Sequence, residues 1–464
     1  MVTELSRQTR STWVLVLACA VTFVVIMDAT IVSVALPDIR AEVGFSPATL
    51  PWVVNAYTLA FAGFLLLGGR IADVVGRRPT LIAGTVVFTV FRSVAGLTDD
   101  PAVLLVARTV QGIGGALLIP VTLALITTTF TDPAARVRAL GTWSAVGGTG
   151  AALGPVIGGL LIDWAGWRWV FHVTVPVGVA VVVCAALVLP RTPPRVPRPR
   201  LDLVGAVLGT VGLLGVIFSI MRSAASSWTA PDVWGPLLAG VVLIGVFLLH
   251  QARTPEPLMP LDLFHERAVS SANTVMFLLG LGFFASPVLI SLYLQDVLGW
   301  APLLAGLGYL PVGVAMVTGA RLAGALTVRL GTRVAAAGFA ALGAVGLAAT
   351  AIALAVDGSF AAFIGPVMLF GFGTAASFTP VTVAATAVAP DRAGLAAGVL
   401  NTVRQTSGAI GLAALTTLAA AASHGPGPAG GYTATGYTAA FAACAVCLVV
   451  ATGVAACAMP GRAA

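Results

Sequence analysis

The chain alternates long apolar runs with short polar segments. About 20 apolar residues are enough for an α-helix to cross the hydrocarbon core of a bilayer, and fourteen runs come close to that length or exceed it. They cover residues 13–36, 51–69, 79–97, 102–126, 137–162, 167–189, 201–221, 234–251, 268–294, 303–326, 333–355, 360–384, 395–420 and 437–459. The pattern predicts an all-α integral membrane protein with about fourteen transmembrane helices.

Composition supports this class and excludes others. Of the 464 residues, 58% are hydrophobic and only 9% are charged, whereas soluble domains carry roughly 25% charged residues. The net charge of +7 comes from arginines dispersed between the apolar runs, so we expect no nucleic-acid partner. The chain has no lysine and no GxxxxGK[ST] phosphate-binding loop, which argues against an ATP-driven pump. Cys444 and Cys447 form a CxxC pair without an accompanying histidine, and no metal is expected there.

Arginine placement predicts the orientation of the helices, because cytoplasmic loops of membrane proteins are enriched in Arg and Lys. One alternate set of loops, together with both termini, carries most of the arginines, and the opposite loops are mainly acidic. Both termini are therefore expected in the cytoplasm, which requires an even number of spans. The composition, rich in Ala, Gly, Val and Arg, is typical of a GC-rich bacterial genome and suggests a multi-pass protein of a bacterial inner membrane.

A charged loop between the second and third runs has a weaker counterpart later in the chain. Its glycines and its last arginine recur 255 residues further on, in segment 324–333, where Val328 replaces Asp73. That offset covers eight predicted helices rather than seven, so we expect two six-helix halves plus two inserted central helices. The predicted domains are residues 1–190, 191–260 and 261–464.

Several motifs, in this order along the chain, resemble those of the major facilitator superfamily, and within it the fourteen-spanning drug:proton antiporters. The matching stretches are MDATIVSVALP (27–37), WVVNAYTLA (52–60), the loop with Gly69, Asp73, Gly76, Arg77 and Arg78, RTVQGIGGA (108–116), GAALGPVIGG (150–159) and LNTVRQTSGAIG (400–411). The resemblance implies the major facilitator fold. It also implies a secondary transporter that exports amphipathic drugs or antibiotics in exchange for protons by alternating access, with the proton gradient as its energy source and no cofactor.

Asp28 is the strongest candidate for proton coupling, because it is the only acidic residue well inside a predicted span. A low-dielectric setting disfavours a charged carboxylate, so Asp28 could bind and release a proton, and a cationic substrate could compete for the same group. The resemblance implies the same role. Arg108 lies inside the fourth span with Gln111 one turn away, and it either faces a polar partner or snorkels toward the external head groups.

The loop with Gly69, Asp73, Gly76, Arg77 and Arg78 is interpreted as a gating clasp. Asp73 can accept hydrogen bonds from arginines or from the amides at a helix N-terminus. The resemblance implies that such a clasp holds the outward-open state. The alternative is a solvated loop that only sets topology, but positive-inside charge does not explain Asp73.

Glycines of the fifth span predict a close helix crossing. Gly150, Gly154 and Gly158 recur at every fourth position and so line one helix face, with Pro155 and Gly159 beside them. The resemblance implies an antiporter hinge that seals the exit path. Packing without a gating role is the alternative.

Polar and aromatic residues inside the spans are candidates for the substrate cavity. They are Asn55, Tyr57, Gln111, Asn273, Phe277, Phe284 and Arg404. The phenylalanines share a face of the ninth span and would form an aromatic wall for an amphipathic substrate, or would face lipid instead. Arg404 either borders the cavity or snorkels toward the cytoplasmic head groups.

Other functions are less compatible with the sequence. A proton symporter or facilitator for a small nutrient or metabolite is the alternative, and the fifth-span motif and the two extra helices argue against it. An enzyme is not expected, because Asp99 and Asp100 lie on an external loop without a second acidic cluster to share a metal.

Overall fold

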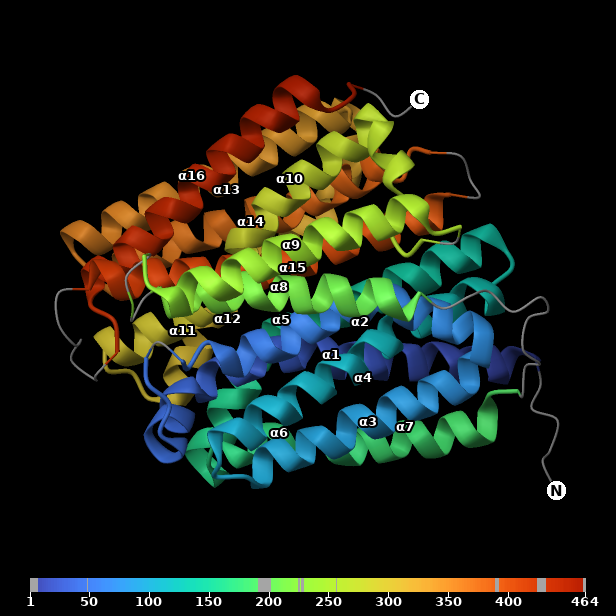
Figure 1. The fold of residues 1–464 in the computed structure, drawn as a ribbon, viewed down its shortest axis with the longest axis horizontal. Helices are drawn as coiled ribbons and strands as arrows, with labels where there is room; N and C mark the ends of the chain where they lie inside the picture. Colours follow the sequence, from blue (N-terminus) through green and yellow to red (C-terminus); the bar gives the residue numbers. More distant parts are fainter. Residues whose placement is uncertain are drawn as a thin grey trace.

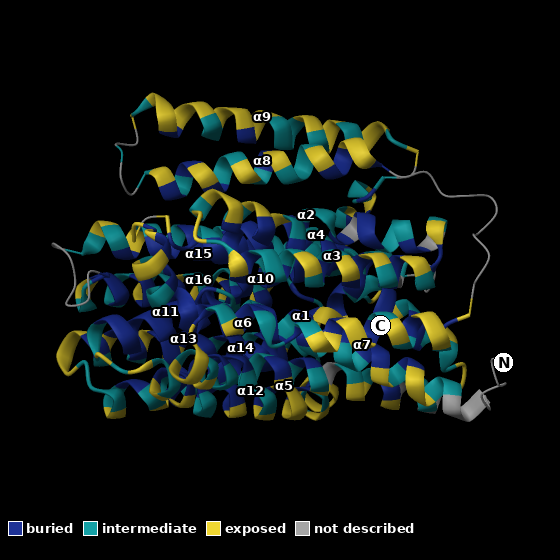
Figure 2. Ribbon diagram, turned by 90° about the horizontal axis from the view of Figure 1, so that it is seen from below, coloured by how far each residue is buried: buried dark blue, intermediate teal, exposed yellow. Residues whose placement is uncertain are grey.

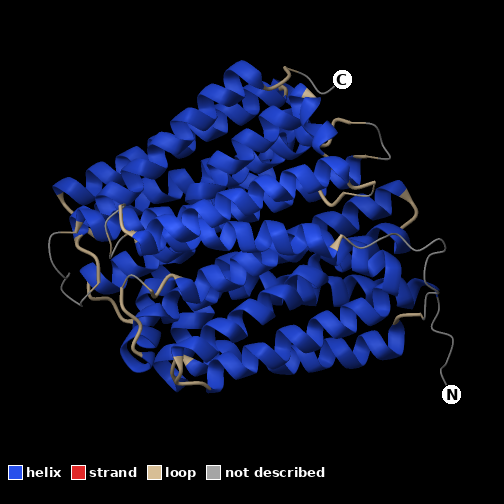
Figure 3. Ribbon diagram, viewed as in Figure 1, coloured by secondary structure: helices blue, strands red, loops and turns tan. Residues whose placement is uncertain are grey.

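A computed structural model describes residues 7–47, 49–190, 202–223, 226, 229–255, 257–388, 392–423 and 431–461. The regular secondary structure of these residues is entirely helical, and loops and turns join the helices (Figure 3). The helices are α1 (Arg7–Val43), α2 (Trp52–Val75), α3 (Arg77–Leu97), α4 (Pro101–Thr129), α5 (Pro133–Ala165), α6 (Arg168–His172), α7 (Val175–Val188), α8 (Leu203–Arg222), α9 (Pro231–Arg253), the 3-10 turn η1 (Leu261–His265), α10 (Arg267–Phe283), α11 (Ser286–Leu292), the π-helical turn η2 (Tyr293–Val297), α12 (Pro302–Leu330), α13 (Thr332–Val356), α14 (Phe360–Ala385), α15 (Ala393–Ala422) and α16 (Ala434–Ala458).

Helix occupies every predicted range, but the predicted number of spans is not confirmed. Two ranges are interrupted: 167–189 contains α6 and α7, and 268–294 contains α10, α11 and the start of η2. Among the described residues, twelve helical stretches are long and apolar enough to cross a membrane. From α2 only the shorter segment Trp52–Leu65 qualifies as apolar, and α15 is not among the twelve. A polar segment, NTVRQTS at 401–407, lowers the hydropathy of α15.

Both chain ends lie at the same end of the molecule (Figure 1). We call the end where α1 begins and α16 finishes the terminal end, and the opposite one the far end. The loops α2–α3, α4–α5, α12–α13 and α14–α15 lie at the terminal end, since successive long helices run in opposite directions. This arrangement agrees with an even number of crossings.

The helices pack in two groups and one separate pair. Helices α1–α7 contact mainly one another, as do α10–α16; we call these groups the first and second bundles. Helices α8 and α9 pack on each other, α8 also contacts α2 and α15, and the pair stands apart from the other helices in Figure 2. The domain boundaries at 190 and 260 stay a prediction, and residues 191–201 lie outside the described residues.

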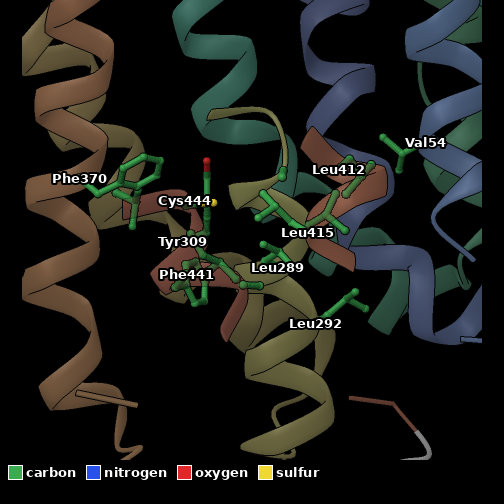
Figure 4. Close-up of a cluster of buried hydrophobic side chains, with 14 of the residues drawn as sticks. Val54, Leu289, Leu292, Tyr309, Phe370, Leu412, Leu415, Phe441 and Cys444 are labelled. Carbon is green, nitrogen blue, oxygen red and sulfur yellow. The ribbon is translucent and has the colours of Figure 1, made fainter. Parts of the chain in front are cut away.

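The largest apolar cluster joins the two bundles. It includes Val54 from α2, Leu289 and Leu292 from α11, and Leu412 and Leu415 from α15, several of which are labelled in Figure 4. Because lipid tails are as apolar as these side chains, close packing rather than exclusion of water stabilises their contacts.

Asp202 connects the separate pair of helices at the terminal end. Its carboxylate accepts hydrogen bonds from the amide of Gly205 (2.8 Å) and from Nε2 of Gln251 (2.7 Å), and Nε2 of His250 lies 2.8 Å away. Burial alone would raise the pKa of Asp202, but these hydrogen bonds together lower it. The ionised carboxylate therefore stabilises the fold at neutral pH, and this contribution is lost as the pH falls through the lowered pKa.

We expect Asp202→Ala to lower the free energy of unfolding by about 1–3 kcal/mol, because it removes a helix cap and leaves Gln251 without its acceptor. Thermal unfolding of the purified protein in detergent measures the change. Asp132→Ala is the control, since the side chain of the exposed Asp132 accepts one hydrogen bond among the described residues, from the amide of Ala135, and should matter less. Equal shifts for both variants would contradict the role given to Asp202.

Candidate functional site

One carboxylate and two guanidinium groups meet inside the first bundle. Nη1 of Arg108 on α4 donates to Oδ2 of Asp28 on α1 at 2.7 Å, and Nη1 of Arg92 on α3 forms an ion pair with Oδ1. Nη1 of Arg108 also lies 2.8 Å from Oε1 of Gln111. All four side chains are fully buried. We call these residues the Asp28 cluster.

Backbone carbonyls satisfy further donors of the two arginines. Arg92 donates from Nε to the carbonyl of Phe171 (2.8 Å) and from Nη2 to that of Val170 (2.6 Å). These carbonyls are available because α6 ends at His172, and the last carbonyls of a helix have no partner within it. Arg108 donates from Nε to the carbonyl of Val53 at 2.9 Å. The helix break between α6 and α7 thus supplies part of the site.

The cluster holds one more positive than negative charge. Each oxygen of Asp28 has an arginine partner, so the two guanidinium groups stabilise the ionised carboxylate against the cost of burial. Arg108 points inward to Asp28 rather than snorkelling to the head groups. Arg92 was missed in the sequence analysis, although an arginine inside the span 79–97 costs about 2.5–3.5 kcal/mol on insertion scales and so signals a buried partner.

Besides Gln111, which belongs to the cluster, two predicted cavity residues lie in the first bundle. The ring of Tyr57 lies 4.5 Å from Cζ of Arg108, and its hydroxyl donates to the carbonyl of Val25 at 3.5 Å. Gln111 accepts from Arg108, as described above. Asn55 is fully buried, with Nδ2 3.6 Å from the sulfur of Met221 on α8.

The fifth-span glycines contact two different helices. A Cβ at Gly150 or Gly158 would lie 2.9 Å from α1 atoms, and one at Gly154 would overlap the hydroxyl of Thr30 on that helix. On another face, a Cβ at Gly159 would overlap the carbonyl of Pro302 on α12. Pro155 also faces α12, because a Cβ at Gly306 would overlap the Pro155 carbonyl. The motif therefore joins α5 to α1 within the first bundle and to α12 across the bundles.

Helices α5 and α12 are close in their far-end halves and diverge toward the terminal end. A Cβ at Gly313 would lie 2.8 Å from Cβ of Ala152, and one at Gly148 would lie 3.9 Å from Val317. Seven residues closer to the terminal end on each helix, at Gly141 and Gly324, a Cβ would meet no atom within 4 Å.

Polar contacts join the bundles at the far end. Nη2 of Arg40 on α1 lies 3.2 Å from Oδ1 of Asp296 in η2, and the hydroxyl of Tyr437 on α16 donates to Oδ2 at 3.2 Å. Tyr432 donates to the carbonyl of Pro47 at 3.0 Å. Burial first, and the negative charge of Asp296 second, raise the pKa of Tyr432, so its hydroxyl stays a donor. We call Arg40, Asp296 and Tyr437 the far-end latch.

The sequence analysis did not identify the latch. Asp296 lies just beyond the predicted span 268–294, and its partner Arg40 is 256 residues away in the chain. The π-helical turn η2 places Asp296 where only 2% of it is exposed. In the sequence, the only indication of the latch was an acidic residue at the end of a predicted span.

The predicted clasp residues surround the turn between α2 and α3. Gly76 has φ of 104°, a conformation that favours glycine. Arg77 donates to the hydroxyl of Thr128 (2.7 Å) and Arg78 to the carbonyl of Ala186 (2.6 Å), both in the first bundle. Gly69 packs near Pro120 on α4. The backbone of Asp73 belongs to α2, but its side chain lies outside the described part, so the clasp stays a prediction.

The predicted aromatic face of α10 packs partly on α15. Phe284 lies against Gly408, which excludes lipid as its surroundings on that side, and Phe277 is half-buried. Asn273 is 4% exposed and donates to the carbonyl of Val269 at 2.8 Å. Arg404 on α15 is half-buried and donates from Nη2 to Oδ1 of Asn401 at 2.6 Å.

Comparisons with known proteins agree on the family. The Major Facilitator Superfamily profile matches residues 18–412. The cephamycin export protein of Amycolatopsis lactamdurans is 39% identical over 425 residues, covering 90% of this chain and 87% of that protein. The puromycin resistance protein of Streptomyces alboniger is 37% identical over 445 residues, covering 93% and 88%.

Solved structures show the same fold at low identity. A bacterial homologue of the human lysosomal transporter Spinster has a TM-score of 0.67 and 17% identity, with 97% of each chain covered. An autoinhibited POT family peptide transporter also has a TM-score of 0.67 and 17% identity, covering 98% of this chain and 99% of that one.

We expect Gly159→Leu to separate α5 from α12, because overpacking a close helix crossing costs about 1–3 kcal/mol. The fraction of molecules in which the two helices are in contact should fall roughly tenfold. Disulfide formation between cysteines introduced at Ala152 and Gly313 measures this, with the five native cysteines replaced by serine. Gly141→Leu on the same helix, where the space is open, should leave cross-linking unchanged. Full cross-linking in Gly159→Leu would show that Gly159 does not determine how closely α5 and α12 approach each other.

Proposed function

The chain belongs to the major facilitator superfamily, and from this membership we propose that it exports amphipathic drugs or antibiotics from the cytoplasm in exchange for protons. The proteins named above are transporters and not enzymes, and two of them are named for antibiotic export or resistance. The observation that supports alternating access is a difference between the two ends of the molecule. The bundles are in contact at the far end, whereas α5 and α12 diverge at the terminal end.

The direction of transport depends on which end is cytoplasmic. The terminal end carries Arg70, Arg77, Arg78, Arg136 and Arg138, so the positive-inside rule assigns it to the cytoplasm of a bacterial cell. With this assignment the described conformation is inward-facing, and the far-end latch closes the route to the outside.

Asp28 is the proposed proton-coupling residue, with Arg108 and Arg92 as its partners. When the far end opens, a proton from outside binds the carboxylate and weakens both ion pairs. When the bundles close again at the far end, the two guanidinium groups return to the carboxylate and stabilise its ionised form, so the proton leaves toward the cytoplasm. The proton gradient supplies the energy, and no cofactor takes part.

Two sets of contacts are proposed to hold the alternate states. The far-end latch stabilises the inward-facing state, and the clasp around Asp73 and Gly76 stabilises the outward-open state. Support for the second comes from the position of the clasp at the terminal end, where the bundles would have to meet.

We expect Asp28→Asn to reduce proton-coupled export to background, because the amide cannot carry the proton between the two sides. A growth-inhibition panel in an efflux-deficient host first identifies an exported compound. Proton release from acidified everted vesicles on its addition then measures exchange. Asp99→Asn, at an exposed ion pair with Arg168, is the control and should behave as wild type.

A wild-type proton signal from Asp28→Asn would refute the role of Asp28. In the wild type, the absence of substrate-driven proton release would refute antiport. Substrate leaving preloaded vesicles together with protons would indicate the symporter for a nutrient or metabolite.

Removal of the latch should favour opening of the far end. For Asp296→Asn we expect a cysteine at Leu50, which is buried beside the latch, to react about tenfold faster with an impermeant maleimide, since breaking a buried pair costs more than 1.4 kcal/mol. Native cysteines are replaced by serine for this measurement. Glu42→Gln is the control, because the Glu42–Arg168 pair (2.5 Å) lies at the same end but within the first bundle.

The double variant Arg40→Asp with Asp296→Arg exchanges the two charges of the latch and should restore slow labelling. If labelling stays fast in the double variant, the latch does not depend on this charge pair.

A further inference from the structure

Arg404 lies in the predicted span 395–420 and has no acidic partner among the described residues. The ion pairs found among the described residues do not include it, and its Nε is buried without a hydrogen-bond acceptor. Its contacts are with neutral groups: Oδ1 of Asn401 and the ring of Phe378, 5.6 Å from Cζ. Buried charges inside a membrane are normally paired, so a cation left with neutral partners indicates that an anion comes from outside the chain.

Arg404 lies in the half of α15 that is nearer the terminal end. It lies eleven residues after the start of α15, which corresponds to about 16 Å along the helix axis. Part of the side chain remains accessible. Asn401 accepts from Nη2 of the guanidinium group, and the buried Nε–H is left without an acceptor among the described residues, a donor that a ligand carboxylate could satisfy with a charge-assisted hydrogen bond.

One aromatic ring, that of Phe378, lies beside this cation, and two more rings continue from it. The rings of Phe283 and Phe378 lie 4.7 Å apart in an edge-to-face arrangement, and Phe284 packs on Phe283 at 5.2 Å. All three are half-buried, as is Arg404. A flat apolar ligand could pack on these rings while its acidic group reaches Arg404.

The charges deeper in the first bundle disfavour a cationic ligand. Asp28 already has an arginine on each oxygen, so a cation would have to displace a buried guanidinium group to reach it. The buried Arg92 and Arg108 face one carboxylate, and the half-buried Arg404 adds a third positive charge, so the net charge of this group of residues is positive.

We propose that Arg404, with Phe283 and Phe378, forms a subsite for the carboxylate of an aromatic acid, so that the substrates of this protein are aromatic organic anions rather than cations. The assignment of these anions as export substrates rests on the function proposed above, whereas the binding site itself does not.

Three probes with the same ring separate charge from shape: 9-anthracenecarboxylate, its methyl ester, and the cation 9-(aminomethyl)anthracene. Binding to the purified full-length protein in neutral detergent is followed by probe anisotropy, without a proton gradient. We expect the acid to bind at least about tenfold more tightly than the ester or the cation, as for a charge-assisted hydrogen bond. Equal affinities, tighter binding of the cation, or no binding of the acid would overturn the proposal.

Variants assign the preference to Arg404. Arg404→Gln should remove the preference for the acid while leaving ester binding unchanged, and Arg404→Lys should keep part of it. Arg222→Gln, in the exposed pair with Asp232 on the separate helices, is the control and should bind as wild type. Retention of the full preference in Arg404→Gln would contradict the assignment.

The anionic group could also be a lipid phosphate, and phosphatidylglycerol added to the same micelles tests this. Displacement of the acid by this lipid, combined with no preference for acid over ester, would assign the site to lipid and overturn the proposal. Because binding is measured without transport, loss of proton coupling in vesicles would refute the proposed function and leave the binding result intact.

Discussion

A charge that this chain places in the hydrocarbon layer needs a partner in the protein or on a bound ligand, because lipid tails offer none. The Asp28 cluster meets this requirement with three helices and the carbonyls of two more. Its arginines reach the carbonyl of Val53 on α2 and those of Val170 and Phe171 on α6, so the interruption after α6 and the cluster depend on each other. The packing of the first bundle is thereby fixed around one carboxylate.

Helix α5 connects the first bundle, built around the Asp28 cluster, to the second bundle. One glycine face holds it against α1, next to Asp28, and the adjacent face with Pro155 and Gly159 holds it against α12. In the proposed alternating-access cycle, the second bundle would move relative to the first by rolling about the far-end crossing. Such a motion changes little at Gly159 and most near Gly141 and Gly324, where the two helices are already apart.

Much of the fold could be predicted from the sequence, because a span needs only a long apolar run. Asp28 and Arg108 were identified from their depth in such runs, and Arg92 could have been found in the same way. Contacts between distant segments could not: the pairing of Arg40 with Asp296 depends on η2 and on how the bundles meet. The spacing of Phe277 and Phe284 predicted a shared face but not that α15 would cover part of it. The number of spans also stayed open, since polar residues in α15 lower its hydropathy.

The carbonyls that accept hydrogen bonds from Arg92 and Arg108 have a consequence for the reversibility of the proposed transport cycle. If Asp28 takes up a proton, both arginines keep neutral hydrogen-bond acceptors. Arg92 keeps two backbone carbonyls on α6, and Arg108 keeps the carbonyl of Val53 and Oε1 of Gln111. These acceptors lower the free-energy cost of protonating Asp28, so the protonated and ionised states of the cluster lie closer in free energy. In the proposed cycle, a small free-energy difference would let the protein pass between these two states in both directions on a modest proton gradient.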